Sequence, residues 1–245
     1  KNIENLEGRH VVAFLQSKIG QEAAHATIQL YAAACEKLEA ALSRYAELKH
    51  TGRGYNFSPD IADARAEALH LARFEGSRAY AALAKIVAAI QPERYQLIAA
   101  CQCQGGARID EVRFTLEDIQ GIRPDPVTGQ EKGWLAVIGK GGKERDIMVP
   151  LPIYQAVAER VLPLAPGQHW GIGNDVDRMA YREKIRQACQ LLGEDYHGSH
   201  GFRWNYAQAR FQEVQAVGLT YNEALSQVSS EMGHERADIT EHYLK

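Results

Sequence analysis

Residues 134–150 read WLAVIGKGGKERDIMVP, in which two apolar runs flank a segment rich in glycine. Trp134 to Ile138 and Arg145 to Pro150 each have the composition of a strand, and the glycines between them predict a turn. Because this connection is longer than two residues, we expect an antiparallel β-hairpin with an extended loop.

The sequence on both sides of this hairpin is predominantly helical in its spacing of apolar residues. In this part of the chain we predict helices over the following ranges: 79–90, 95–103, 176–192, 200–217 and 221–232. Residues 109–114 are expected to begin as a helix. The turn-rich segment 121–132 has no role that the sequence reveals.

The first part of the chain is predicted to form a separate helical unit, with helices over 8–19, 21–48 and 62–71. Ser58-Pro59 is typical of a helix start, because proline is tolerated at the first helical position. We place a domain boundary between residues 75 and 76. The predicted fold class is mainly α with a small antiparallel β-sheet (α+β), as a helical domain over 1–75 followed by a second domain over 76–245.

Composition excludes several classes of protein. The chain has 245 residues, 45% hydrophobic and 24% charged, which is ordinary for a globular protein. No stretch approaches the ~20 apolar residues of a membrane-spanning helix, so no membrane partner is expected. Four cysteines are too few for a disulfide scaffold and favour a reducing, cytoplasmic compartment. A net charge of −3 argues against a protein that simply coats nucleic acid.

Four short patterns follow one another in the second domain. They are Gly-Gly-Ala-Arg-Ile-Asp-Glu-Val (105–112), Gly-Lys-Gly-Gly-Lys-Glu-Arg (139–145), His-Gly-Phe-Arg (200–203) and Met-Gly-His (232–234), with Tyr243 beyond the last. Each alone has an ordinary explanation, such as a surface ion pair between Arg108 and Asp110 or Glu111. The glycine turn also lacks the Ser or Thr that follows the lysine of a phosphate-binding loop. Only the combination, in this order, is specific.

Together, the patterns resemble the tyrosine recombinase, or phage integrase, family over residues 79–245. The resemblance implies a site-specific DNA recombinase, the integrase of a mobile element, that cleaves DNA through a 3′-phosphotyrosyl link to Tyr243 without ATP. Glu111 matches the family's acidic position, which implies that it orients the arginine-bearing helix. The first domain is similar to the family's core-binding (SAM-like) DNA-binding domain, and its short length leads us to expect a missing N-terminal arm.

The resemblance also implies the partners. These are double-stranded DNA at recombination or attachment sites, further copies of the chain in a homo-tetramer on DNA, and accessory DNA-bending or directionality factors. Only Leu244 and Lys245 follow Tyr243. The C-terminal segment with which many relatives dock onto a neighbouring subunit is therefore expected to be absent, truncated or disordered.

The residue types in these patterns suit attack on a phosphodiester. The candidate catalytic residues are Arg108, Lys140, His200, Arg203, His234 and Tyr243. Guanidiniums can donate paired hydrogen bonds to the non-bridging oxygens, where charge gathers. His200 could take the proton of Tyr243, and Lys140 could protonate the leaving 5′ oxygen. No carboxylate cluster suits Mg²⁺, so we expect no metal and no cofactor.

Two assignments have rivals. Lys143 is the alternative to Lys140, whereas Lys132 lies too early in the sequence. Tyr206 and Tyr221 are alternative nucleophiles, but only Tyr243 has the right distance after His234.

A net-acidic chain needs local basic sites to hold DNA. Arg178, Arg182 and Arg186 repeat every four residues and would line one helix face, where they could track phosphates or form a solvated charged surface. Lys143 of the hairpin loop is a further candidate for DNA binding. The same sequence leaves three other functions open: a type IB topoisomerase, a catalytically silent DNA-binding relative, and a helical scaffold protein.

Overall fold

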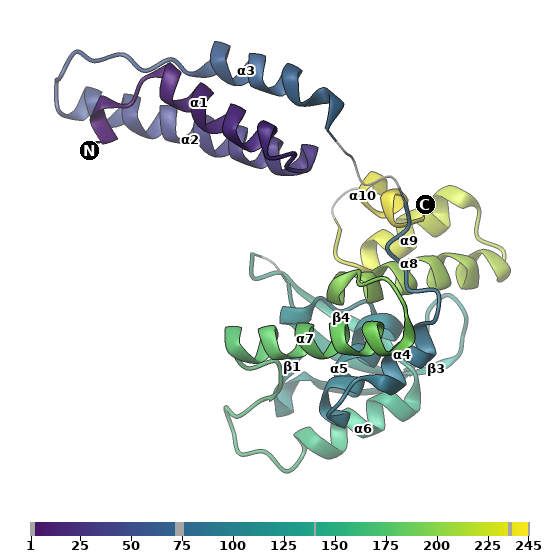
Figure 1. Cartoon of the computed structure of the whole chain (residues 1–245). Coiled ribbons are helices and arrows are strands. Elements are labelled where there is room, and N and C mark those ends of the chain that lie inside the picture. The colour runs from purple at the N-terminus through teal and green to yellow at the C-terminus, as the bar shows by residue number, and fades with distance from the viewer. Residues whose placement is uncertain (1–2, 72–75, 140, 235–236, 245) are drawn as a thin grey trace. The chain divides into compact units, whose positions relative to one another are not determined.

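The computed structural model describes residues 3–71, 76–139, 141–234 and 237–244 (Figure 1). The chain divides into two compact units, Lys1–Glu75 and Gly76–Lys245. We describe each by itself.

Unit 1 is a small helical bundle. It contains η1 (Ile3–Asn5), α1 (Gly8–Gly20), α2 (His25–Leu48), α3 (Ser58–Glu67) and η2 (Ala68–His70). Apolar side chains from all three α-helices meet in one core, in which Leu15, Ile28 and Ile61 are almost fully buried. Pro59 stands in the first turn of α3, as predicted. Helix α2 begins four residues later than expected, because α1 continues to Gly20 and the chain turns before His25.

A three-stranded antiparallel sheet forms the centre of unit 2. Strands β2 (Ile119–Pro124), β3 (Glu131–Ile138) and β4 (Glu144–Val149) lie in this order, and the β3–β4 hairpin is the one predicted from residues 134–150. Every second side chain of the hairpin is buried, as in the pair Leu135 and Ile147. A pleated strand presents alternate residues to one face, so this face packs against the helices.

One expectation about unit 2 was wrong. Residues 109–114 do not begin a helix but form a 3₁₀ turn, η3 (Ile109–Glu111), and strand β1 (Arg113–Phe114), which pairs with β5 (Trp170–Gly171) as a second small sheet. Segment 121–132, whose role the sequence did not reveal, supplies most of β2, the following turn and the start of β3. Gly121 has a positive φ of 88° at an irregularity in the β2–β3 register. Because this irregularity interrupts the alternation of buried and exposed residues, the sequence pattern did not predict β2.

Helices surround these sheets, in agreement with the predicted fold class. They are α4 (Leu83–Ala89), α5 (Glu93–Gly105), α6 (Leu151–Val161), α7 (Asp175–Leu192), α8 (Gly198–Ala216), α9 (Tyr221–Glu231) and α10 (Ala237–Glu241), with the 3₁₀ turns η4 (Leu116–Asp118) and η5 (His242–Leu244). Figure 1 shows α8, α9 and α10 gathered with the C-terminus at one end of the unit. One core surrounds α5 and the sheet, and a second lies between α8, α9 and η5.

The ends of these helices follow ordinary capping rules. Asn174 caps α7 by accepting a hydrogen bond from the Asp177 backbone N–H (3.0 Å). Helix α5 ends at Gly106, which has the positive φ of 66° that favours glycine. Among the described residues, no helix has both the length and the apolar character needed to cross a bilayer.

Gly133 provides a test of how β3 packs on α6. A Cβ atom at this position would lie 2.1 Å from Cβ and Cγ of Tyr154. Gly133→Ala must therefore push helix and sheet apart, and we expect a loss of about 1–3 kcal/mol in the free energy of unfolding. All three tryptophans of the chain lie in unit 2, so urea unfolding followed by tryptophan fluorescence measures the loss there.

The matched control is Gly173→Ala, because the nearest atom to a Cβ at Gly173 is 3.8 Å away. Equal stability of the two variants would contradict the close contact at Gly133.

Candidate active site

The four sequence patterns meet at one place in unit 2. Arg108 follows the end of α5 and precedes η3, while Arg145 lies on β4. His200 and Arg203 stand one turn apart at the start of α8, as their spacing predicted. His234 follows the end of α9, and Tyr243 lies in η5. The sheet and the C-terminal helices thus bring together site residues that are up to 135 positions apart in the sequence.

The carboxylate of Glu111 is the centre of this arrangement, with 1% of its side chain exposed. Its Oε1 accepts a hydrogen bond from Arg108 Nη1 (2.7 Å), and its Oε2 accepts one from the Arg108 backbone N–H (2.6 Å). Oε2 also accepts a bond from Arg145 Nη2 (2.7 Å) and lies 3.9 Å from Arg203 Nη1. Glu111 therefore holds the guanidiniums of Arg108 and Arg145 and lies close to that of Arg203. Its expected role in orienting the arginine-bearing helix stays a prediction.

The charges at this point do not balance, because one carboxylate faces three guanidiniums. Burial alone would raise the pKa of Glu111, but the charge of Arg145 and the hydrogen bonds from Arg108 outweigh it and lower that pKa. Burial, followed by the charge of Arg108, lowers the pKa of Arg203 to about 10. With its pKa lowered, Glu111 supplies one negative charge among three guanidiniums, so the cluster carries an excess of positive charge that suits an oxyanion.

The two predicted arginines differ in access. Arg108 keeps 31% of its side chain exposed and lines a cleft with Lys143, Arg145, His234 and Gly233. Arg203 has only 1% exposed. Its Nη1 donates to the Gly106 carbonyl and its Nη2 to the Met232 carbonyl (3.0 Å). Arg108 is therefore the guanidinium that a ligand in the cleft reaches first, with the charge of Arg203 behind it.

Tyr243 lies with its hydroxyl against His200. The distance from Tyr243 Oη to His200 Nε2 is 2.8 Å. The tyrosine ring is buried against Trp204 and His234, with centroid distances of 5.2 and 5.4 Å. Gln208 Nε2 donates to the Tyr243 carbonyl (3.0 Å), which anchors the backbone of η5 on α8. The nucleophile candidate is held in the unit that carries the arginines.

Both histidines are neutral at pH 7. Desolvation, then the charge of Arg203, lowers the pKa of His200 to about 4, although the residue as a whole is exposed. Desolvation and the charges of Arg203 and Arg108 likewise lower the pKa of His234 to about 4. Arg203 Nη2 lies 3.4 Å from His234 Nε2 as a donor, so Nδ1 carries the proton and donates to Thr240 Oγ1 (2.8 Å). Neutral His200 can accept the proton of Tyr243 through Nε2.

The rival residues lie elsewhere. Tyr206 is buried, and its hydroxyl donates to Glu231 Oε2 (2.8 Å). Tyr221 is 46% exposed, and its hydroxyl lies 3.2 Å from Glu241 Oε1. Lys132 pairs with Glu213 at 3.7 Å, away from the cleft.

The lysine assignment is only partly visible. Lys140 lies outside the described residues, so its role stays a prediction. Lys143 lines the cleft, and its carbonyl accepts a hydrogen bond from the Gly139 N–H (2.7 Å), which closes the β3–β4 turn.

Two of the three arginines of α7, Arg178 and Arg186, already have partners on the chain. Arg178 Nε lies 2.7 Å from Asp110 Oδ1, and the guanidinium also contacts Asp175. Arg186 contacts Glu183, and its guanidinium carbon lies 5.0 Å from the centre of the Tyr196 ring. Arg178 and Arg186 would have to exchange these carboxylates for phosphates. A DNA contact by Arg178, Arg182 and Arg186 therefore stays a prediction.

Sequence reasoning missed Arg145 as a site residue. The sequence did contain a signal for it. Arg145 is two residues before Ile147 and four before Val149, so on strand β4 its side chain lies on the same, core-facing side as theirs. An arginine on the buried face of a strand requires a buried partner, and here that partner is Glu111.

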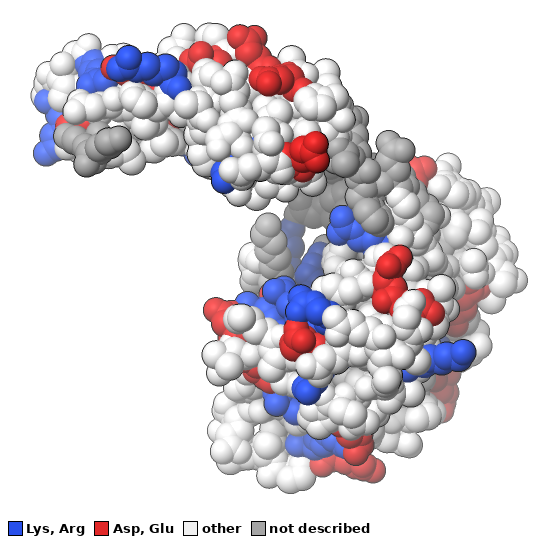
Figure 2. Space-filling model, in the orientation of Figure 1, with Lys and Arg blue, Asp and Glu red and all other residues white. Residues whose placement is uncertain are grey.

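Two further features could indicate a ligand site on unit 2: a continuous basic surface and a cluster of metal-binding side chains. Figure 2 shows basic and acidic residues interspersed on the visible face, without a continuous basic surface. Within the described parts of the chain, no three His, Cys, Asp or Glu side chains are grouped to hold a metal ion.

Solved structures of similar fold are tyrosine recombinases. The chain matches XerH site-specific recombinase bound to a palindromic difH substrate with a TM-score of 0.62 and 14% identity, over 100% of this chain and 68% of that chain. It matches a lambda integrase dimer bound to a COC' core site with a TM-score of 0.64 and 15% identity, over 99% and 65%. For the Tn1549 transposon integrase with circular intermediate DNA, the values are 0.60 and 13%, over 100% and 83%.

These comparisons establish the fold. The chain has the fold of the tyrosine recombinases, which confirms at that level the resemblance found in the sequence. It spans about two thirds of the length of the first two proteins. No protein-family model matches the sequence, and a search of curated proteins gave no match.

The histidines make stability depend on pH. His200 and His234 have a folded pKa of about 4, below the ordinary value of 6.5 expected for the unfolded chain. Between these values the unfolded chain binds more protons, so the free energy of unfolding should fall as the pH falls from about 7 to 4. NMR titration of the imidazole signals, with urea unfolding at each pH, measures both effects.

Replacing either histidine with glutamine should reduce this dependence. Titration of His234 near 6.5 would contradict its placement beside Arg203.

Proposed function

We propose that this protein is a site-specific DNA recombinase, the integrase of a mobile element, that uses Tyr243 as its nucleophile. The observation that carries the proposal is the 2.8 Å contact between Tyr243 Oη and His200 Nε2, beside the cationic cluster that Glu111 fixes. A nucleophile, a neutral base and an oxyanion site thus lie together on one unit. The solved relatives of this fold were captured on DNA, which supports the same substrate class here.

In the first step, Tyr243 attacks the scissile phosphate. The Oη–H proton passes to His200 Nε2, the Oη–P bond forms and the bond from phosphorus to the 5′ oxygen breaks. The 5′ oxygen takes a proton from a lysine of the β3–β4 turn, with Lys140 as the first candidate and Lys143 as the second. The product is a 3′-phosphotyrosyl link and a free 5′ hydroxyl, and attack by a partner strand's 5′ hydroxyl reverses these bond changes.

The cationic cluster stabilises the charge that develops during attack. Arg108 is exposed to the cleft and can donate to a non-bridging oxygen, while Arg203 adds its charge from behind. Fixed cations of this kind supply a large part of catalysis, because they need no reorganisation as the charge grows. The proposed reaction draws on no cofactor, and the phosphotyrosyl link conserves the bond energy that rejoining needs.

The partners follow from this function. We propose double-stranded DNA with specific recombination or attachment sites, a homo-tetramer on two such sites, and accessory DNA-bending or directionality factors. A cytoplasmic location accords with the four reduced cysteines.

Covalent capture tests the proposal. The protein is mixed, in EDTA, with nicked suicide duplexes tiled across the DNA that flanks its gene, and adducts that survive SDS are counted. We expect the wild type to form an adduct that Tyr243→Phe abolishes, while gel-shift affinity for the same duplex changes less than about twofold. Loss of one hydroxyl removes the nucleophile but few DNA contacts.

Tyr221→Phe is the matched control and should form the adduct at the wild-type rate. Retention of the adduct by Tyr243→Phe would contradict the assignment. Relaxation of supercoiled plasmid without any site requirement would favour a topoisomerase instead.

A second experiment identifies the general acid. Lys140→Ala should slow cleavage by about 10²-fold or more, because a positioned acid contributes on that scale. A 5′-phosphorothiolate duplex, whose leaving group needs no proton, should restore most of the rate to this variant. Rescue of Lys143→Ala in place of Lys140→Ala would move the role to Lys143.

A further inference from the structure

A second buried cluster of charges lies beside the candidate active site. It centres on Arg210 of α8, which has 5% of its side chain exposed. Its Nη1 and Nη2 bind the two oxygens of Asp125 at 2.6 and 2.9 Å. Its Nε and Nη2 bind the two oxygens of Glu231 at 2.9 and 2.8 Å. Arg210 thus makes a two-bond ion pair with each of two buried carboxylates.

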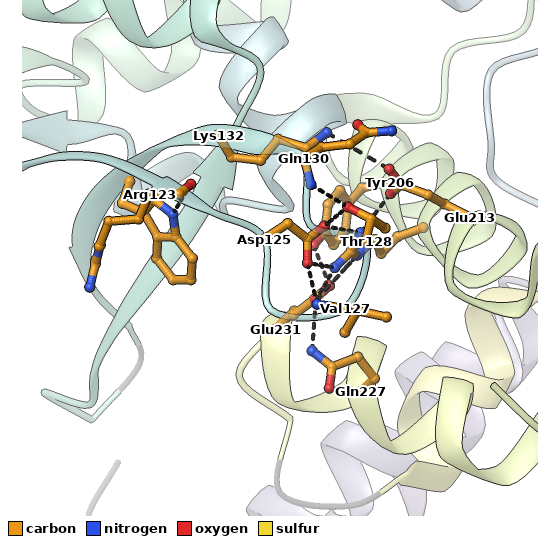
Figure 3. Close-up of polar contacts among 12 residues, drawn as sticks. Arg123, Asp125, Val127, Thr128, Gln130, Lys132, Tyr206, Glu213, Gln227 and Glu231 are labelled. Carbon is orange, nitrogen blue, oxygen red and sulfur yellow. Dashed lines mark hydrogen bonds and ion pairs between the residues drawn. The ribbon is translucent and has the colours of Figure 1, made fainter. Parts of the chain in front are cut away.

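This cluster joins three elements that are distant in the sequence. Asp125 begins the turn between β2 and β3, and Glu231 is the last residue of α9. Figure 3 shows Asp125 and Thr128 of the turn facing Glu231 and Gln227 of α9. Thr128 Oγ1 donates to Asp125 (2.8 Å), and Gln227 Nε2 donates to Glu231 (2.9 Å), so both carboxylates are held on further sides.

Tyr206 connects the cluster to the end of α5. Its hydroxyl donates to Glu231 Oε2, and its ring packs so closely on Gly106 that a Cβ there would lie 2.6 Å away. The Gly106 carbonyl accepts hydrogen bonds from Arg203 and from Arg145 Nη2 (3.4 Å).

The end of α9 contacts two arginines of the candidate active site directly. The Glu231 carbonyl accepts a hydrogen bond from Arg145 Nη1 (2.6 Å), and the Met232 carbonyl accepts one from Arg203 Nη2 (3.0 Å). The last carbonyls of a helix lack partners within it, and the negative end of the helix dipole favours cations. The position of this helix end therefore sets the position of two of the three guanidiniums.

Asp125 and Arg210 both remain charged at neutral pH. Burial alone would raise the pKa of Asp125, but hydrogen bonds from Arg210 outweigh it and lower that pKa to about 2. Burial alone would lower the pKa of Arg210, but its bonds to Glu231 and Asp125 raise it. Directional ion pairs, unlike apolar contacts, fix the rotation of α9 as well as its distance.

We propose that Glu231, held by Arg210 and Tyr206, is a positioning residue that sets the end of α9 so that its carbonyls hold Arg145 and Arg203 in the active site. The expected effect on DNA cleavage rests on the proposed recombinase function. The effect on the geometry of the site does not.

The test compares Glu231→Gln with Glu213→Gln. Glu213 is a matched control, because it also binds Arg210 Nη1 (2.7 Å) but lies on α8 itself and makes no contact with α9 that the structure describes. At saturating suicide duplex, Glu231→Gln should lower the cleavage rate about tenfold or more, since small misplacements of catalytic groups are costly. Glu213→Gln should stay within about twofold, and both variants should bind DNA as the wild type does.

A second readout does not depend on cleavage. Burial, followed by the charges of Arg203, Arg108 and Arg145, lowers the pKa of His234. Displacement of Arg203 and Arg145 should therefore remove part of this effect and raise the NMR titration midpoint of His234 in Glu231→Gln but not in Glu213→Gln. If the wild type forms no adduct, the proposed function fails while this midpoint still decides the inference. Equal midpoints in the wild type and both variants, or equal losses of rate in both variants, would overturn it.

Melting temperatures show whether the variants are folded at the assay temperature. Should Glu231→Gln fail to fold, Tyr206→Phe removes one hydrogen bond to Glu231 and no charge. It should show the same two effects at smaller size, and wild-type values in both readouts would overturn the proposal.

Discussion

The candidate site depends on the buried carboxylate of Glu111. Three guanidiniums that all lie within 4 Å of one carboxylate would repel one another without it. The negative charge of Glu111 stabilises their approach and still leaves an excess of positive charge. The local sequence supplies this arrangement, because the 3₁₀ turn after Arg108 brings the side chain of Glu111 back onto the backbone N–H of Arg108. The end of α5, β4 and the start of α8 then converge on one anion.

A second charged cluster, centred on Arg210, is connected to the first through the end of α9. Arg210 joins the β2–β3 turn to the end of α9, and that end presents consecutive carbonyls to Arg145 and Arg203. Tyr243, the candidate nucleophile, is brought to the same place by separate contacts, since η5 packs on α8 through Trp204 and Gln208. The sheet, α8, α9 and η5 are therefore coupled through polar contacts around a small volume.

The parts of the fold that local sequence determines were predicted well. The β3–β4 hairpin and helices α7 and α9 have strong periodicity, and His200, Arg203, His234 and Tyr243 come together as their order suggested. Strand β2 was missed because Gly121 interrupts its alternation. The pairing of Asp125 with Arg210 was missed because it joins residues 85 positions apart, and no local pattern encodes such a contact.

The central claim is that Tyr243 becomes linked to DNA, and peptide mapping of the covalent adduct tests it most directly. Complete cleavage after Arg and Lys releases residues 237–245, ADITEHYLK, which contain one tyrosine. We predict that the nucleotide mass is found on this peptide, at Tyr243. Nucleotide attached to the peptide that contains Tyr206 or Tyr221, with none on residues 237–245, would contradict this account of the site.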